Sequence, residues 1–270
     1  MGVITISRGS YSKGKATAEK LAQLLGYECI SRDILLETSA QFSINELKLI
    51  RAIHDAPSIL ERFQHGKEKY IIFIREAFLA HIRKDNVIYH GLAGHFFCQG
   101  IPNILKIRII ANLEDRIKEE MRREQISEKE ARHILIKDDE ERRKWSMHLY
   151  GIDTNDPALY DIVMHIDNLK VDDAVEILAE IAKRPCFQTT QESQKIIDDY
   201  HVAAQAQETL FDQFPAAQVK CNDGVVTVNV ESTLSQEQEV INNINNTLKE
   251  KNIDGLKDVK VSTVLLDSGD

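Results

Sequence analysis

A segment rich in glycine, serine and lysine near the N-terminus carries the clearest chemical pattern in the chain. Residues Gly9 to Thr17, Gly-Ser-Tyr-Ser-Lys-Gly-Lys-Ala-Thr, fit the pattern G-x-x-x-x-G-K, directly after a strand-like run and at the start of a helical pattern. Glycines allow the backbone N–H groups of such a loop to surround phosphate oxygens, and the helix N-terminus adds partial positive charge. We therefore predict that this loop binds the phosphates of ATP.

Individual loop residues have different expected roles. Lys15 is expected to reach the β- and γ-phosphates and to act in catalysis, and Thr17 to place its hydroxyl on Mg²⁺, one residue later than in the G-K-[ST] arrangement. A chance glycine-rich turn is the alternative interpretation, and the position between a strand and a helix speaks against it. The predicted ATP-binding residues are Gly9, Ser10, Ser12, Lys13, Gly14, Lys15, Ala16 and Thr17.

The elements that must position this loop alternate between short apolar runs and longer helical patterns over residues 1–184. Strands that are separated by helices predict βαβ units and a parallel sheet. We therefore expect an α/β domain with the P-loop NTPase fold. The expected strands are Val3–Ser7, Asn86–Tyr89, Ile104–Ala111 and Asp161–Ile166, and the expected helices are Lys15–Leu25, Leu113–Gln125, Ser127–Leu135 and Val171–Ala182.

The pattern changes after Pro185. Residues 185–197 are polar and are predicted to be a linker, and residues 198–270 are predicted to form a small α+β domain. Asn222-Asp223-Gly224 is typical of a hairpin turn between two strands. The expected elements of this domain are helix Asp198–Phe214, strands Ala217–Asn222 and Val225–Val230, helix Ser235–Lys251 and strand Val259–Leu266.

Composition excludes several classes of protein. The net charge of -9 disfavours a general nucleic-acid binder, which needs a basic surface. We expect no signal peptide, because no basic stretch is followed by a long apolar core, and no transmembrane segment, because no apolar run reaches about 20 residues. We therefore expect a cytoplasmic protein. The four cysteines form no C-x-x-C pair and are expected to be reduced, with a disulfide pair as the alternative that the sequence leaves open. His90 and His95 lack a third ligand at metal-binding spacing, so we interpret them as loop or core residues.

Several segments in order make residues 2–183 resemble the cytidylate kinase-like family, a branch of the P-loop nucleoside monophosphate kinases. The resemblance rests on the order and spacing of these segments together. They are Ile4-Thr5-Ile6-Ser7-Arg8-Gly9, Leu25-Gly26-Tyr27 with Ser31-Arg32-Asp33-Ile34-Leu35, Val87-Ile88-Tyr89-His90-Gly91, Ile109-Ile110-Ala111-Asn112-Leu113-Glu114-Asp115-Arg116, Asp139 with Arg142-Arg143-Lys144, and Asp156-Pro157 with Tyr160-Asp161-Ile162-Val163.

This resemblance implies that ATP, with Mg²⁺, donates its γ-phosphate to a nucleoside monophosphate, most simply CMP or dCMP. It implies a lid whose catalytic cations are Arg142 and Arg143, while Arg116 and Arg123 are further candidates for contact with phosphates. It also implies an acceptor site that includes Arg32, Asp33 and Gly91. From the residues alone, the charged segment at 140–144 is equally typical of a solvated helix face, Arg32 of a surface residue and Asp33 of a helix N-cap.

The chain departs from the family pattern at four positions. Ser31 stands where an aspartate is common, Leu92 where an arginine is common, Ser12 where a glycine is frequent, and Ala16 where kinases have glycine or serine. The first two positions lie on the acceptor side. They keep two alternatives open: a non-catalytic regulator that senses ATP, and a kinase for another small-molecule acceptor.

Residues 199–267 resemble a BON domain, a small α/β module of bacterial proteins. The resemblance rests on the turn at Asp223-Gly224 with the following strand, the helix Ser235–Lys251 and the segment Ile253–Val259. It implies a small-molecule, lipid or protein ligand for this domain. The residues show no basic face or exposed apolar stretch that demands a membrane, which favours a regulatory or dimerising unit.

Overall fold

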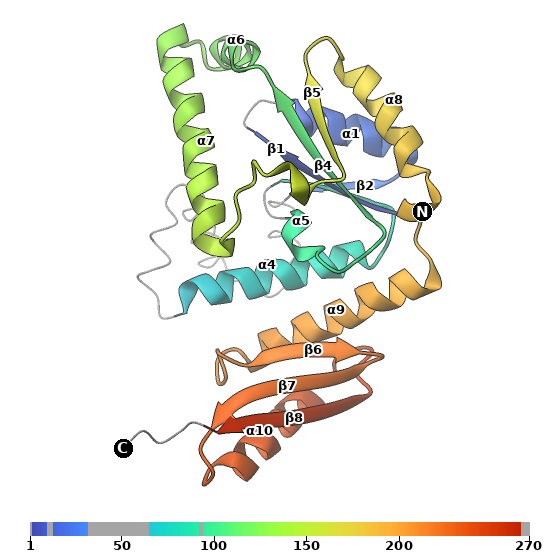
Figure 1. Cartoon of the computed structure of the whole chain (residues 1–270), viewed down its shortest axis with the longest axis vertical. Coiled ribbons are helices and arrows are strands. Elements are labelled where there is room, and N and C mark those ends of the chain that lie inside the picture. The colour runs from blue at the N-terminus through green and yellow to red at the C-terminus, as the bar shows by residue number, and fades with distance from the viewer. Residues whose placement is uncertain (1, 10–12, 32–64, 92–93, 266–270) are drawn as a thin grey trace. The chain divides into compact units, whose positions relative to one another are not determined.

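The computed structural model describes residues 2–9, 13–31, 65–91 and 94–265, and Figure 1 shows the course of the chain. Within these residues there are two sheets, one with five strands and one with three. Among the described residues, no helix is both long and apolar enough to cross a membrane.

Contacts along the chain divide it into two compact units. The larger consists of Met1–Pro57 and Lys84–Thr189, and the smaller of Ser58–Arg83 and Thr190–Asp270. A segment from the first half of the sequence therefore belongs with the C-terminal unit. The predicted domains, residues 1–184 and 198–270, follow chain order and therefore place this segment with the larger unit.

The larger unit contains a five-stranded sheet in the order β2-β3-β1-β4-β5, and every neighbouring pair is parallel. This confirms the predicted parallel α/β sheet. Its strands are β1 Val3–Arg8, β2 Glu28–Ser31, β3 Val87–His90, β4 Ile104–Ala111 and β5 Ile162–Ile166. Its helices are α1 Gly14–Leu25, α5 Gly94–Phe97, α6 Leu113–Glu124, α7 Glu128–Tyr150 and α8 Val171–Ala182, with the short 3-10 helices η2 Pro157–Leu159 and η3 Pro185–Phe187.

Alternation along the strands gives the two faces of this sheet different chemistry. Ile4 and Ile6 of β1 point into a core that includes side chains of α1 and α8. Thr5 and Ser7 point to the opposite face, because successive side chains of a strand alternate. We call the face that packs against α1 and α8 the apolar face, and the face that carries Thr5 and Ser7 the polar face.

The central strand β1 lies between β3 and β4. The chain leaves β1 for β2 and β3 on one side and later places β4 on the other side, so the strand order reverses at β1. In open parallel sheets, ligands bind beyond the carboxyl ends of the strands at such a reversal. The carboxyl end of β1 is where the glycine- and lysine-rich loop begins.

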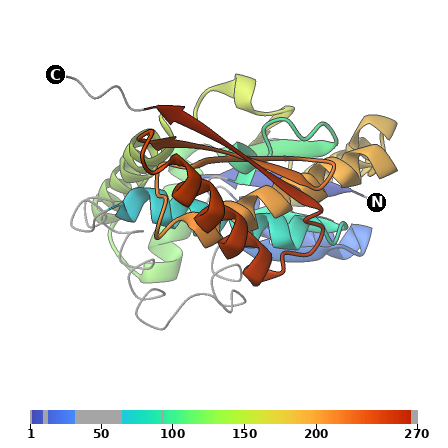
Figure 2. The ribbon, with the colours of Figure 1, turned by 90° about the horizontal axis from the view of Figure 1, so that it is seen from below.

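The smaller unit contains the strand order β6-β7-β8, with β6 and β7 antiparallel and β7 and β8 parallel. Asp223 and Gly224 both have positive φ in the hairpin turn, as the sequence predicts. Figure 2 shows α10 lying across one face of this sheet, and α9 and α10 share one apolar core with the strands. The elements are α4 Gly66–Ile82, α9 Gln191–Leu210, β6 Gln218–Asn222, β7 Val225–Ser232, α10 Glu237–Lys251 and β8 Asp258–Leu265.

Helix α4 packs beside α9 within the smaller unit. A buried pair joins them, with Glu76 Oε1 of α4 lying 3.4 Å from His201 Nε2 of α9. Arg83, directly after α4, reaches Asp198 of α9 at 3.3 Å. The sequence analysis did not predict α4. Buried residues occur all around this helix, so its apolar positions do not mark a single face.

Two predicted segments differ in extent from the observed elements. Residues 185–197, the predicted linker, contain η3 and the first turns of α9, and the boundary between the two compact units falls within them, after Thr189. Thr190 starts α9 with a capping box, in which its hydroxyl accepts a hydrogen bond from the Ser193 N–H. Helix α7 does not end at Leu135 but continues to Tyr150, where Gly151 adopts positive φ and ends it. The residues proposed for a lid therefore lie on one continuous helix.

Candidate active site

The phosphate loop joins β1 to α1. Lys13 adopts the left-handed conformation directly before the helix, and the structure shows no side-chain cap on the first turn of α1 and no acidic residue within it. Gly14 is required here, since a Cβ at this position would lie 2.6 Å from Arg8 Cβ. The N-terminus of α1 therefore offers backbone donors and partial positive charge to an anion. Ser10 and Ser12 lie outside the described residues.

Lys15 lies on the exposed first turn of α1. Its Nζ atom is 3.7 Å from Oε1 of Glu19, which lies one helical turn later, and 63% of its side chain is exposed. An exposed pair of this kind contributes little to stability. The ammonium can therefore exchange Glu19 for a phosphate at small cost, which agrees with the predicted contact to the β- and γ-phosphates.

The role of Thr17 as a magnesium ligand stays a prediction. The side chain of Thr17 is fully buried, and its hydroxyl donates to the carbonyl oxygen of Lys13 at 3.0 Å. Among the residues that the structure describes, no group of three or more His, Cys, Asp or Glu side chains is placed to hold a metal. Mg²⁺ is commonly bound through substrate phosphates and water instead.

A cavity of about 260 Å³ opens beside the start of the phosphate loop. It brings together the ends of β1 and β4, the first turn of α6, the middle of α7 and the segment before η2. The described side chains that line it include five arginines and one carboxylate. They are Ser7, Arg8, Gly9, Arg108, Ile110, Ala111, Arg116, Asp139, Arg142, Arg143, Thr154 and Asn155.

Helix α7 supplies the lid residues to this cavity. Arg142 Nη1 donates to the carbonyl oxygen of Arg8 at 3.3 Å, which ties α7 to the end of β1. Arg143 is half exposed and lies 4.0 Å from Asp153. The structure thus brings both predicted lid arginines to the first residues of the phosphate loop.

Arg116 and Asp139 form the best-defined ion pair in the cavity. Arg116 Nη1 and Nη2 donate to the two carboxylate oxygens of Asp139 at 2.7 and 2.8 Å, and only 9% of the arginine side chain is exposed. Such paired, parallel hydrogen bonds fix orientation as well as charge. A Cβ at Gly9 would lie 3.7 Å from Asp139 Oδ1, so the pair lies directly over the start of the loop.

The sequence analysis missed Arg108, which comes from the polar face of β4. Its Nη2 donates to Asn155 Oδ1 at 2.7 Å, and its Nη1 lies 3.4 Å from Ser7 Oγ. The guanidinium also lies 5.7 Å from the centre of the Tyr160 ring. Alternation along β4 was the available signal, because Arg108 occupies a position of the strand opposite to the apolar core residues.

A buried cluster of polar side chains, formed by Tyr160, Ser7 and His95, lies next to Arg108. The Tyr160 hydroxyl donates to the Thr154 carbonyl oxygen at 2.9 Å and lies 3.2 Å from Ser7 Oγ and 3.3 Å from His95 Nε2. Burial, together with the charges of Arg108 and Lys106, lowers the pKa of His95 to about 3. His95 is therefore neutral near pH 7, and the cluster adds no second positive charge beside Arg108.

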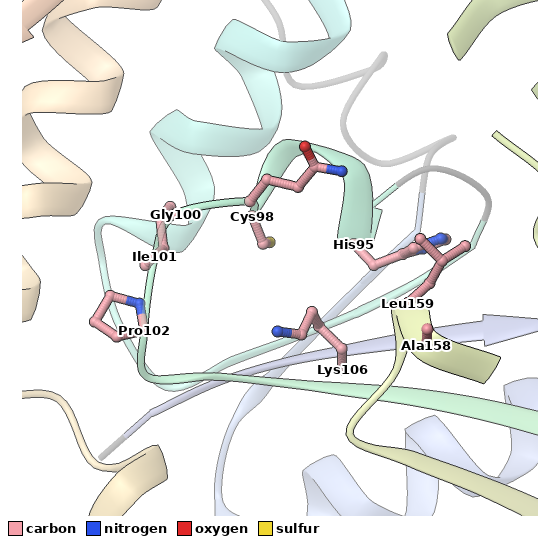
Figure 3. A pocket seen from close by; sticks show the side chains of 9 residues that line it. His95, Cys98, Gly100, Ile101, Pro102, Lys106, Ala158 and Leu159 are labelled. Carbon is pink, nitrogen blue, oxygen red and sulfur yellow. The ribbon is translucent and has the colours of Figure 1, made fainter. Parts of the chain in front are cut away.

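A second cavity, of about 420 Å³, lies on the same face nearer the amino end of β4. Figure 3 shows His95, Cys98 and Pro102 around it, with the Lys106 side chain extending into it. Asp161 Oδ2 lies 3.7 Å from Lys106 Nζ and accepts the Lys106 backbone N–H at 2.8 Å. Lys106 therefore already has a carboxylate partner, in contrast to Arg108.

The predicted acceptor residues are placed only in part. Gly91 follows β3, and its N–H donates to the Ile6 carbonyl oxygen of β1 at 3.1 Å, so it lies at the carboxyl edge of the sheet. Arg32 and Asp33 lie outside the described residues. Arg123, at the end of α6, pairs with Glu124 at 2.8 Å and does not line the phosphate-loop cavity.

Comparison with known proteins identifies the group to which this arrangement belongs. The model of the cytidylate kinase-like family matches residues 3–168, more than half of the chain. The chain belongs to the cytidylate kinase-like family. It is therefore a phosphotransferase of the nucleotide kinase type, which confirms the resemblance described above for this part of the sequence. The BON-like character of residues 199–267 stays a prediction.

Individual relatives support the same assignment. The chain is 30% identical to a cytidylate kinase from Staphylothermus marinus over 190 residues, 68% of this chain and 98% of the relative. It is 29% identical to a cytidylate kinase from Thermoplasma acidophilum over 184 residues, 67% of this chain and 90% of the relative. An uncharacterized protein from Eubacterium ventriosum shares the fold, with a TM-score of 0.52, 21% identity, and coverage of 68% of this chain and all of that one.

Proposed function

We propose that this member of the cytidylate kinase-like family transfers the γ-phosphate of ATP to a nucleoside monophosphate, with CMP and dCMP as the first candidates. The observation that carries the proposal is the arginine-lined cavity directly beside the phosphate loop. Cations that converge beside a phosphate-binding loop suit a reaction in which negative charge moves between phosphate oxygens. The cytidylate kinases among its relatives favour a cytidine nucleotide as the acceptor.

In the proposed reaction, the loop holds the donor and the lid stabilises the transferring group. Backbone N–H groups at the start of α1, together with Lys15, bind the β- and γ-phosphates. An oxygen of the acceptor phosphate attacks the γ-phosphorus, the bond from that phosphorus to the bridging oxygen breaks, and ADP leaves. Arg142 and Arg143 neutralise charge on the transferring group. Mg²⁺ would arrive with the donor phosphates and shield their charge.

The pair formed by Arg116 and Asp139 has a positioning role in this proposal. Because both hydrogen bonds of the pair are short and Arg116 is buried, Asp139 anchors α7 to α6 above Gly9. Arg142 lies one turn after Asp139 on the same helix, so the anchor also sets the position of the lid arginine. Arg32, Asp33 and Gly91 stay proposed acceptor contacts.

The experiment measures ADP formation from Mg·ATP with a panel of CMP, dCMP, UMP, AMP and GMP. We expect CMP or dCMP to stimulate turnover, and we expect Lys15→Ala to reduce kcat/KM by about 100-fold or more, because a charged contact to the transferring phosphates is lost. Lys20→Ala is the matched control, since Lys20 is an exposed lysine of α1 that pairs with Asp172 away from the loop. It should retain wild-type turnover.

Two outcomes would redirect the assignment. Tight binding of ATP without stimulation by any monophosphate would refute the kinase activity and support an ATP-sensing regulator. Turnover that depends on Lys15 but prefers a monophosphate other than CMP or dCMP would keep the reaction and replace the acceptor.

A further inference from the structure

Arg108 is a half-buried cation in the phosphate-loop cavity without a carboxylate partner among the described residues. Its contacts are to the neutral oxygens of Asn155, Ser7 and Tyr160 and to the Tyr160 ring. The other half-buried cation of this strand face, Lys106, has Asp161. A guanidinium that is partly removed from water is costly unless an anion compensates its charge.

The contacts of Arg108 hold its guanidinium in one orientation. Asn155 accepts from one terminal nitrogen at 2.7 Å, and Ser7 lies 3.4 Å from the other. Tyr160 is itself held by its hydrogen bond to the Thr154 carbonyl oxygen. Arginine presents its donors in a planar fork that matches phosphate oxygens, so a fixed guanidinium is preorganised for a phosphate group.

The position of Arg108 in the sheet indicates whether it contacts the phosphates of the donor ATP or the phosphate of the acceptor nucleotide. The phosphate loop leads into α1, which covers the apolar face of the sheet. Arg108 and its partners Ser7 and Tyr160 lie on the polar face, on the other side of β1. In phosphoryl transfer, the attacking and leaving oxygens lie in line on opposite sides of the transferring phosphorus.

We infer that Arg108 binds the phosphate of the acceptor nucleotide. The inference rests on the proposed function and adds a binding residue from β4 to the acceptor site. The neutral His95, which lies beside Tyr160, adds no further positive charge next to Arg108. The ligand class is a phosphate monoester carried by a nucleoside, approached from the polar face of the sheet.

The test compares Arg108→Gln and Arg108→Lys with Lys106→Gln, a matched control on the same strand and face whose side chain extends into the second cavity. Initial rates are measured with CMP varied at saturating Mg·ATP, and then with Mg·ATP varied at saturating CMP. We expect Arg108→Gln to raise the KM for CMP about 10- to 100-fold through loss of a charged hydrogen bond, with the KM for ATP nearly unchanged. Arg108→Lys should restore part of the loss, and Lys106→Gln should have little effect.

Equilibrium binding separates this inference from the proposed function. Calorimetric titration of wild type and Arg108→Gln with CMP, in the presence of a non-hydrolysable ATP analogue with Mg²⁺, measures acceptor affinity without turnover. Binding that depends on Arg108 without any turnover would refute the kinase activity and support the inference. An increase in the KM for ATP alone, equal CMP affinity in both proteins, or no CMP binding by wild type would overturn the inference. Near-wild-type thermal unfolding of the variant shows that a change in CMP affinity does not reflect loss of folding.

Discussion

The neutral, buried state of His95 makes the stability of the larger unit depend on pH. His95 is only 4% exposed, and its ring contacts those of Phe96 and Tyr160 at centroid distances of 4.1 and 4.8 Å. Burial and then the charges of Arg108 and Lys106 lower the pKa of His95 to about 3. In the unfolded chain, the pKa of a histidine is about 6.5.

The sign and size of the effect follow from this difference in pKa. Below about pH 6.5 the unfolded chain binds a proton at His95, whereas the folded chain does not bind it until about pH 3. Stability that is fully present above pH 6.5 is therefore lost as the pH falls toward 3. Each pH unit in this window costs about 1.4 kcal/mol, so the step from pH 6.5 to 4.5 removes about 2 to 3 kcal/mol.

The perturbation is His95→Gln, which keeps a polar side chain near Tyr160 but cannot take up the proton. Urea unfolding is followed at pH 7.5 and 4.5 by the fluorescence of Trp145, the single tryptophan of the chain, which is buried on α7 of the same unit. We expect the free energy of unfolding of wild type to fall by about 2 to 3 kcal/mol more than that of the variant between the two pH values.

His133→Gln provides the control, because His133 is an exposed histidine of the same unit. It should lose as much stability as wild type between the two pH values. If His95→Gln and wild type lose equal free energy on acidification, then His95 is not held neutral by its surroundings, and the role assigned to the polar cluster is wrong.

Three further substitutions test separate parts of the structure. Gly14→Ala places a methyl group 2.6 Å from the Cβ of the arginine that ends β1, so we expect the affinity for an ATP analogue, measured by calorimetry, to fall at least about tenfold. Asp139→Asn weakens both hydrogen bonds of buried Arg116, and we expect a loss of about 1 to 2 kcal/mol in urea unfolding, since Asp139 is 40% exposed. Leu248→Ala removes a fully buried side chain of the smaller core and should cost about 2 to 5 kcal/mol in thermal unfolding, whereas Leu234→Ala, at a site 76% exposed, should be nearly neutral.

Each of these expectations has a distinct contrary result. Unchanged nucleotide affinity in Gly14→Ala would show that the loop tolerates the methyl group by moving. Asp139→Asn with wild-type stability would show that the pair with Arg116 is replaced by water. Equal stability losses in the two leucine variants would contradict the placement of Leu248 in the core.

The sequence by itself determined the local elements of the larger unit. The phosphate loop could be predicted from the sequence because its pattern lies within nine consecutive residues, and the strand and helix on either side of it were found where that pattern requires them. Binding of ATP by this loop stays a prediction. The strands and helices on either side were predictable from the period of their apolar residues. The sequence analysis missed α4, where burial on several sides removes that period. It also missed the start of α9 within residues 185–197, because it did not recognise Thr190 as a helix cap.

Only the tertiary structure decided how the cavity is assembled. Ser7, Arg108, Arg142 and Asn155 come from separate parts of the chain and meet because β1 pairs with β4 and α7 returns over the end of β1. Arg108 is missed in the sequence because a strand arginine opposite a core face usually points to solvent. Whether such a side chain meets water or a ligand depends on what covers that face, and residues distant in sequence provide that cover.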